Sequence, residues 1–162
     1  MIRAWLLLAL LASAPVAAVE DWMPDPALTP GAVNPAVTQD NIQSTICTSG
    51  WTATIRPPAS YTNALKKTQL AQARYADKSM ADYEEDHLVS LQLGGHPSDP
   101  QNLFPQPYAG RCGARVKDVI ETKLKRLVCA GTLTLDAAQS AISTDWVAAY
   151  SQYVKPIECV TP

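Results

Sequence analysis

The sequence predicts a small α+β domain whose elements run helix, strand, strand, helix, helix. Apolar residues recur at helical spacing over two long segments near the C-terminus, residues 114–130 and 136–154. Two short segments bounded by turn residues, 84–93 and 102–108, precede them and predict strands. The length of 162 residues suits one domain once the ends are removed.

The N-terminus predicts a secretory signal peptide over residues 1–18. A single arginine precedes an apolar stretch that ends at Ala12, and the small residues of "VAA" at 16–18 suit a cleavage site. The apolar stretch is too short to cross a bilayer, and a retained N-terminal anchor is the alternative. We therefore expect an exported protein, periplasmic or secreted, whose mature form does not lie in the membrane.

The segment after the signal peptide, residues 19–44, predicts an irregular or disordered lead-in, because it contains four prolines and little periodicity. The folded domain is predicted over residues 45–159. It starts with "TICTSGWTATIRPP", where β-branched residues flank a Ser-Gly turn and predict a short strand or hairpin. "SYTNALKKTQLAQARYA" then predicts a helix capped by Ser60 or Thr62.

The first of the two central strands is predicted by alternation over residues 84–93, where three aliphatic residues alternate with Ser90 and Gln92. A Gly-Gly turn and a loop with two prolines follow. The second predicted strand, "NLFPQPY", is limited to an edge by its prolines.

The last two segments predict amphipathic helices. The buried stripe of the first comprises Val116, Ile120, Leu124 and Leu127. The inner face of the second comprises Leu135, Ala138, Ile142, Trp146, Ala149 and Tyr153. Gly131 and Pro156 supply their C-terminal stops.

The four cysteines of an exported chain predict two disulfides. A zinc site is disfavoured because no C-x-x-C pair occurs. Of the three pairings that four cysteines allow, we favour Cys47–Cys129 with Cys112–Cys159. The first would tie an early segment to a late helix, and the second would pin the C-terminal tail.

Charge is unevenly distributed. The net charge of −2 gives no support to a nucleic-acid partner, yet residues 111–126 carry six basic and two acidic side chains. Such a stretch can contact phosphates, or it can be a solvated helix face. The candidate nucleic-acid-binding residues are Arg111, Arg115 and Lys117.

Residues that suit phosphodiester chemistry are concentrated in "YEEDHLVSLQLGGHPSDPQNLFPQPY", residues 83–108. His87 could take a proton from water, and a carboxylate such as Asp86 could hold a divalent ion. Because neighbouring strand residues point to opposite faces, the Asp-His pair needs either local distortion or separate tasks. A purely structural histidine, hydrogen-bonded to Asp86, is the alternative. Asn102 could fix the imidazole tautomer or tie the loop, and His96 is expected to be an exposed loop residue.

The same block resembles the core of HNH endonucleases, and in particular small exported bacterial proteins described as HNH-endonuclease-like. Their pattern is matched almost throughout residues 83–108, and a looser likeness extends over residues 43–154. The resemblance implies a ββα-metal core with flanking helices. It also implies a hydrolase that cuts DNA, or RNA. Low sequence specificity is expected because backbone phosphates would supply most of the binding, and the protein is expected to be a monomer.

The resemblance implies a role for each matched residue. His87 would be the general base and Asn102 would orient it. Asp86 would hold one divalent metal ion, Mg²⁺ by expectation with Mn²⁺ or Zn²⁺ as alternatives. Glu85, and less so Glu84, would lie in the outer shell of this site.

The chain departs from the family pattern at Gly113, where the resemblance implies an Asn that completes the metal site. Water could fill that position, Asp118 or Glu121 could substitute, or the metal could bind weakly or not at all. The alternative function is therefore a catalytically inactive HNH-fold module that binds nucleic acid or envelope partners. A toxin-like effector nuclease is a third possibility.

Overall fold

The structure is a computed structural model, and it describes residues 22–73, 75 and 77–159. The predicted signal peptide, residues 1–18, lies outside the described residues. Within the described ranges, none of the helices is both long and apolar enough to span a bilayer.

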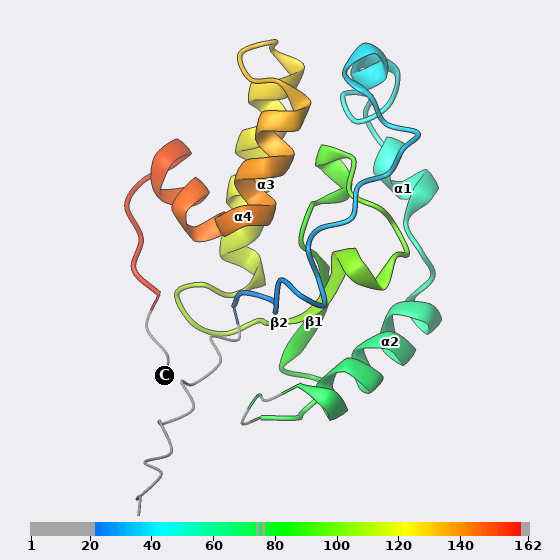
Figure 1. Cartoon of the computed structure of the whole chain (residues 1–162), viewed down its shortest axis with the longest axis vertical. Helices are drawn as coiled ribbons and strands as arrows, with labels where there is room; N and C mark the ends of the chain where they lie inside the picture. Colours follow the sequence, from blue (N-terminus) through cyan, green and yellow to red (C-terminus); the bar gives the residue numbers. More distant parts are fainter. Residues whose placement is uncertain (1–21, 74, 76, 160–162) are drawn as a thin grey trace, which may run out of the picture.

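A two-stranded antiparallel sheet lies at the centre of this α+β fold (Figure 1). Strand β1 comprises Tyr83–His87 and strand β2 comprises Leu103–Pro107. Helix α2, Ala59–Gln72, contacts both strands. Helices α3, Ala114–Cys129, and α4, Leu135–Tyr153, pack against each other on the other side of the molecule.

The first strand is shorter than its sequence pattern predicts. Strand β1 pairs with β2 from Tyr83 opposite Pro107 to His87 opposite Leu103. After His87 the chain turns and forms a 3₁₀ helix, Leu91–Leu93. The prediction of a strand over residues 84–93 is wrong beyond His87, because all residues from 88 to 91 are buried and the apparent alternation does not mark an outer face. The predicted second strand is confirmed.

The N-terminal lead-in is irregular, as predicted, but it is part of the folded domain. Trp22 is buried, and its carbonyl oxygen accepts a hydrogen bond of 2.8 Å from the indole N–H of Trp146. Val33 forms a β-bridge with Gly95, and a 3₁₀ helix spans Gln39–Ser44. Residues from 22 onward therefore pack against the domain that was predicted to start at residue 45.

The predicted hairpin near residues 46–58 is a helix instead. Helix α1, Trp51–Ile55, begins after Gly50, whose φ of 79° lies in the left-handed region that glycine adopts without strain. The two prolines that follow Arg56 end this helix. The β-branched residues of this segment therefore do not form a strand, because Gly50 allows a helix to begin and the two prolines end it.

The two C-terminal helices form most of the core, and both were predicted from their periodicity. The buried residues of α3 include Ile120, Leu124 and Val128, which join one apolar cluster with Ile142 and Trp146 of α4. Helix α4 bends visibly in Figure 1. The bend lies at Asp145, which has non-helical φ and ψ and whose carboxylate accepts the N–H groups of residues 147 and 148.

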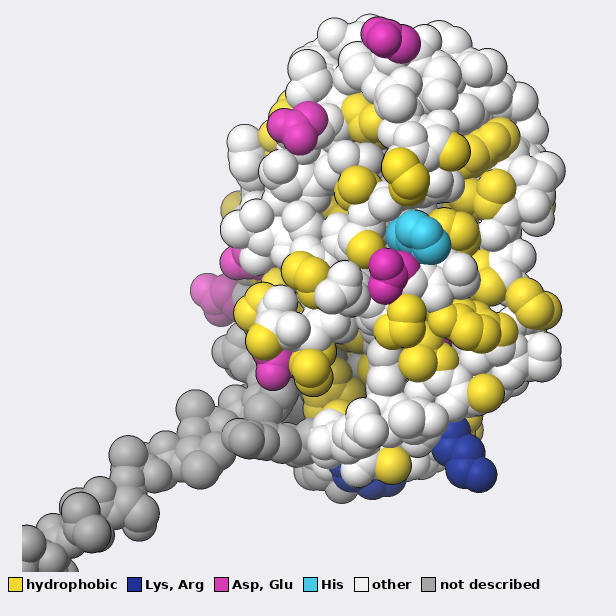
Figure 2. All heavy atoms as spheres, turned by 45° about the vertical axis from the view of Figure 1, so that its right-hand side comes forward, with side chains coloured by type: hydrophobic (Ala, Val, Ile, Leu, Met, Phe, Trp, Pro, Cys, Tyr) yellow, Lys and Arg dark blue, Asp and Glu magenta, His cyan; other side chains and the backbone are white. Residues whose placement is uncertain are grey.

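Positive charge is sparse on the α1 and α2 side of the molecule. On the face turned forward in Figure 2, lysine and arginine side chains are visible only at the lower edge. Apolar side chains and a histidine beside an acidic side chain occupy its middle. This face therefore offers few cations to a nucleic-acid backbone.

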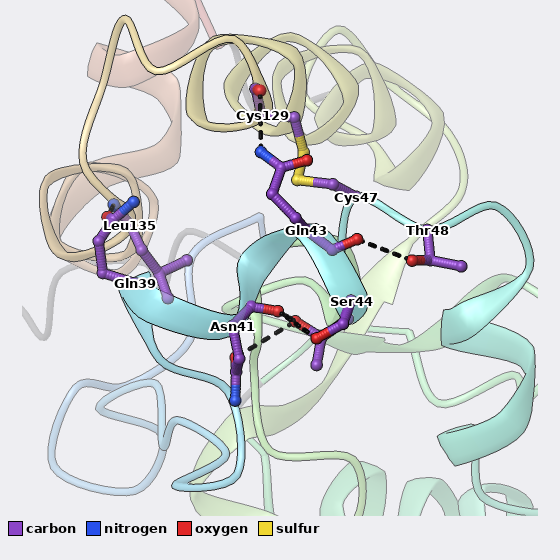
Figure 3. Close-up of a disulfide and its surroundings, with 9 residues drawn as sticks. Gln39, Asn41, Gln43, Ser44, Cys47, Thr48, Cys129 and Leu135 are labelled. Atoms are coloured by element: carbon purple, nitrogen blue, oxygen red, sulfur yellow. Dashed lines mark hydrogen bonds between the residues drawn. A yellow bond between two sulfur atoms is a disulfide. The ribbon is translucent and has the colours of Figure 1, made fainter.

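Both disulfides have the favoured pairing, Cys47–Cys129 and Cys112–Cys159. Figure 3 shows the first bridge, where the Gln43 side chain donates to the Cys129 carbonyl oxygen and the Gln43 carbonyl accepts from Thr48. This bridge attaches the segment before α1 to the end of α3. The two bonds indicate that the protein works in an oxidising compartment.

Candidate functional site

His87 is the last residue of β1, and its ring is held in one orientation. Its Nε2 lies 2.8 Å from the carbonyl oxygen of Pro97, and the side chain is 5% exposed. A carbonyl oxygen can only accept a hydrogen bond, so Nε2 carries the hydrogen and the neutral ring has its lone pair on Nδ1. Burial lowers the pKa of His87, against the opposing effects of the Pro97 hydrogen bond and the Asp86 charge. The geometry therefore favours a neutral imidazole with Nδ1 as its basic atom.

Asn102 holds together the loop that carries Pro97. Its Oδ1 accepts the Val89 N–H at 2.9 Å, and its Nδ2 donates to the carbonyl oxygens of Val89 and His96, both at 3.0 Å. It makes no hydrogen bond to the imidazole, so the expected orientation of His87 is indirect. Gly95 is required here, because a Cβ would lie 1.7 Å from the Val89 carbonyl oxygen. The loop thus holds the Pro97 carbonyl oxygen where it accepts the hydrogen bond from His87 Nε2.

Lys117 is the residue that joins α3 to the end of β1. Its Nζ donates to Asp86 Oδ2 at 2.9 Å, to the His87 carbonyl oxygen at 2.7 Å and to Glu121 Oε1 at 2.6 Å. Lys117 is fully buried, with 0% of its surface exposed. Lys117 was a candidate for phosphate contact, with a solvated helix face as the alternative, and its burial agrees with neither. The residue lies on the inward side of α3, between Asp86 and Glu121.

The charge of Lys117 is held in place by its carboxylate partners. Burial by itself lowers the pKa of Lys117, but the charges of Asp86 and Glu121 and their hydrogen bonds raise it above its ordinary value. Burial also raises the pKa of Glu121, and the Lys117 ammonium opposes that rise. The Lys117 ammonium therefore lies between Glu121 and Asp86 and bonds to both. This contact conflicts with the suggested role of Glu121 as a substitute metal ligand.

Asp86 and His87 have separate partners, as the alternation of strand side chains requires. The Asp86 carboxylate lies toward α3 and Lys117, whereas the His87 ring bonds to the loop at Pro97. In the part of the chain that the structure describes, no hydrogen bond joins the two side chains, so the alternative of a histidine bonded to Asp86 is not observed. The Asp86 charge nevertheless acts on the imidazole.

Two further carboxylates lie near Asp86. Burial raises the pKa of Glu84, and the charges of Asp86 and Asp118 raise it further. Burial also raises the pKa of Asp118, with a second contribution from Asp86. The cations Arg56 and Lys117 oppose both shifts. Arg56 is exposed and was missed in the sequence, because no local signal relates it to Glu84 or Asp118, which lie far from it along the chain.

These carboxylates have the donor chemistry that suits a hard divalent ion, and the Asp86 charge contributes, after burial, to the raised pKa of both Glu84 and Asp118. Among the described residues, no three His, Cys, Asp or Glu side chains lie close enough together to hold an ion by themselves. Water or substrate oxygens would have to complete the coordination of an ion bound to Asp86.

Gly113 cannot be replaced by the asparagine that the family pattern implies without moving the backbone. A Cβ at this position would lie 2.5 Å from the carbonyl oxygen of Tyr108 and 2.8 Å from that of Ala109. The loop between β2 and α3 passes too close for any side chain. The backbone before α3 therefore leaves no space for a side chain at position 113.

Glu85 lies on the other side of the hairpin from Asp86. Both of its carboxylate oxygens are buried, and neither has a hydrogen-bond partner among the described residues. The nearby Lys66 ammonium donates instead to the carbonyl oxygens of Met80 and Tyr83. Burial raises the pKa of Glu85 to about 8, although the Lys66 charge opposes the shift. This buried position differs from the one expected for Glu85, which was the outer shell of a metal site at Asp86.

Glu85→Gln should stabilise the protein increasingly as the pH rises. The unfolded chain loses the Glu85 proton near pH 4.5 and the folded protein near pH 8, so the free energy of unfolding falls across this window. The substitution should remove that fall and add on the order of 4 kcal/mol at pH 8, with almost no gain near pH 4. Urea denaturation at several pH values measures this difference. Glu158→Gln, at an exposed carboxylate, is the control, and a gain independent of pH would contradict the assignment.

The remaining basic candidates, Arg111 and Arg115, are exposed at the beginning of α3. The Arg115 charge acts on the Tyr108 phenol, whose pKa is raised by burial and by the neighbouring Glu84. Tyr108 is 42% exposed. Arg115 therefore lies near Tyr108, where it could contact a phosphate.

Comparisons of this chain with models of known protein families, with curated proteins and with solved structures found no match. The functional argument therefore depends on the residues of the site itself.

Proposed function

We propose that this chain is an exported endonuclease of the HNH type, which hydrolyses phosphodiester bonds of DNA, or of RNA, with low sequence specificity. The orientation of His87 carries this proposal, because the Pro97 carbonyl leaves Nδ1 as the basic atom of a ring near the Asp86 charge. The order of β1, β2 and α3, with Lys117 tying the helix to the strand, supports a ββα core.

In this proposal His87 Nδ1 takes a proton from a water molecule, whose oxygen attacks phosphorus while the bond to the leaving sugar oxygen breaks. The leaving oxygen takes up a proton from solvent. Because Nε2 keeps its hydrogen and donates it in a hydrogen bond to the Pro97 carbonyl oxygen, Nδ1 has a lone pair for this transfer. The exposed Arg56 and Arg115 would bind backbone phosphates, so binding should weaken as salt rises.

Asp86 would hold one divalent ion, with Glu84 and Asp118 near enough to add to the negative potential. Mg²⁺ is the expected ion, and Mn²⁺ or Zn²⁺ could replace it. When bound, such an ion would stabilise charge on the phosphate and on the leaving oxygen.

A catalytically inactive HNH-fold module is the second candidate. It is favoured by two observations: Lys117 engages one oxygen of Asp86, and Gly113 offers no ligand. Such a protein would bind nucleic acid or an envelope partner without cutting.

A plasmid-nicking assay tests the proposal and separates the two candidates. The oxidised mature protein would be mixed with supercoiled plasmid and Mg²⁺ or Mn²⁺, with EDTA as control, and with an RNA substrate in parallel. We expect metal-dependent nicking that Asp86→Asn lowers about 100-fold, since the amide keeps an acceptor for Lys117 but loses the charge. Nicking that persists in EDTA would exclude the metal assignment. Retained filter binding of DNA with no nicking would favour the inactive module.

A further inference from the structure

We infer that Lys117 is the positioning residue of this site: its ammonium fixes Asp86 and the His87 backbone to α3 and sets how strongly the site holds a divalent cation. This inference rests on the proposed function and extends it to a residue that the sequence had placed on the surface.

The first step of the argument is geometric. The Lys117 ammonium has three N–H groups, and its three acceptors are Asp86 Oδ2, the His87 carbonyl oxygen and Glu121 Oε1. Two of these acceptors belong to the adjacent residues that the proposed reaction uses. A shift of Lys117 would therefore move the Asp86 carboxylate and the His87 backbone together.

The second step concerns the direction of approach to Asp86. The Lys117 side chain is 0% exposed, whereas the Asp86 side chain is 15% exposed. The lysine therefore holds Oδ2 from the protein side, and a ligand can reach Asp86 only from the solvent side. The other carboxylate oxygen, Oδ1, is the atom that remains for this ligand.

The third step concerns charge. A positive charge 2.9 Å from Asp86 Oδ2 repels a second cation at the same carboxylate. Glu121, which is also buried, partly offsets this repulsion. The Lys117–Glu121 pair therefore tunes the affinity for a divalent ion, and each member should shift that affinity in the opposite direction.

Two variants test this inference. Lys117→Met/Glu121→Gln removes one positive and one negative charge and leaves no carboxylate unpaired at position 121. Glu121→Gln alone keeps the lysine and its bonds to Asp86 and His87 but removes the balancing charge. Lys123→Met, which removes an exposed lysine from the same helix, is the control. Mn²⁺ affinity would be measured by electron paramagnetic resonance, and kcat and KM by nicking.

The double variant should bind Mn²⁺ about tenfold more tightly and Glu121→Gln about tenfold more weakly than the unmodified protein. The double variant should also have a kcat about 100-fold lower, with KM for DNA little changed, because the reacting groups lose their fixed position. A purely structural lysine would leave both quantities unchanged in a folded variant.

Unchanged Mn²⁺ affinity and kcat in the folded double variant would overturn the inference. If the double variant does not fold, unchanged Mn²⁺ affinity in Glu121→Gln would overturn it instead, and so would a lack of Mn²⁺ binding in every variant. Unmodified protein that binds Mn²⁺ but nicks no plasmid would refute the proposed function alone, since the affinity comparison still tests Lys117.

Discussion

His87→Ala should lower the rate of plasmid nicking by about 10³-fold and leave DNA binding unchanged. The reason is the fixed orientation of the ring, in which the Nε2 hydrogen is bonded to the Pro97 carbonyl oxygen and Nδ1 has the lone pair. Alanine removes the only basic nitrogen that the proposed reaction uses. The proposed phosphate contacts of Arg56 and Arg115 do not involve the imidazole, so affinity for the backbone should remain.

The matched control for this variant is His96→Asn. The Nδ1 atom of His96 accepts the backbone N–H groups of Ser98 and Asp99, and an asparagine side chain can accept similar bonds. This variant should nick at nearly the unmodified rate. The assay uses supercoiled plasmid under single-turnover conditions, with filter binding in parallel. Full activity in His87→Ala would remove the general base from the proposal.

Lys117→Met should lower the free energy of unfolding by about 4 kcal/mol, because it leaves the carboxylates of Asp86 and Glu121 without their shared cation. Glu121 is buried and cannot turn to solvent without disturbing α3. The carbonyl oxygen of His87 also loses its donor at the end of β1. The loss should therefore exceed that of an ordinary surface lysine by several fold.

Urea denaturation of the single and double variants measures this effect. Adding Glu121→Gln to Lys117→Met should recover more than half of the lost stability, since the unpaired buried charge is gone. Lys123→Met should change the stability by less than about 0.5 kcal/mol. A small loss in Lys117→Met, with no recovery in the double variant, would show that the ion pair contributes little to folding.

The elements with a periodic pattern or clear flanking turns were predicted correctly, whereas the short helix α1 was not. Helix α3 follows from the spacing of residues such as Ile120 and Leu124, and strand β2 follows from its composition and flanking turns. The disulfide pairing was also chosen correctly among three. The strand predicted over residues 84–93 was too long. Apolar and polar residues alternate there, but the sequence does not show that residues of both kinds become buried.

The candidate site was predicted in its residue types but not in its arrangement. Asp86, His87 and Asn102 are close in sequence and in space, yet each has its own partners. Arg56 was missed, because only the folded chain brings it near Glu84 and Asp118. The burial of Lys117 was not predicted, because the sequence of a basic helix does not show which of its charged side chains points inward.

The sequence by itself determined the three long helical segments, the second strand and the acid, imidazole and amide groups of residues 83–108, since spacing and composition act over a few residues. Only the tertiary structure decided which side of α3 faces the hairpin. That choice depends on how α3 packs against distant segments, and it turned Lys117 inward to Asp86 and Glu121. It also decided that the Pro97 carbonyl meets His87, because the loop closes through Asn102 and through a glycine with no room for a side chain.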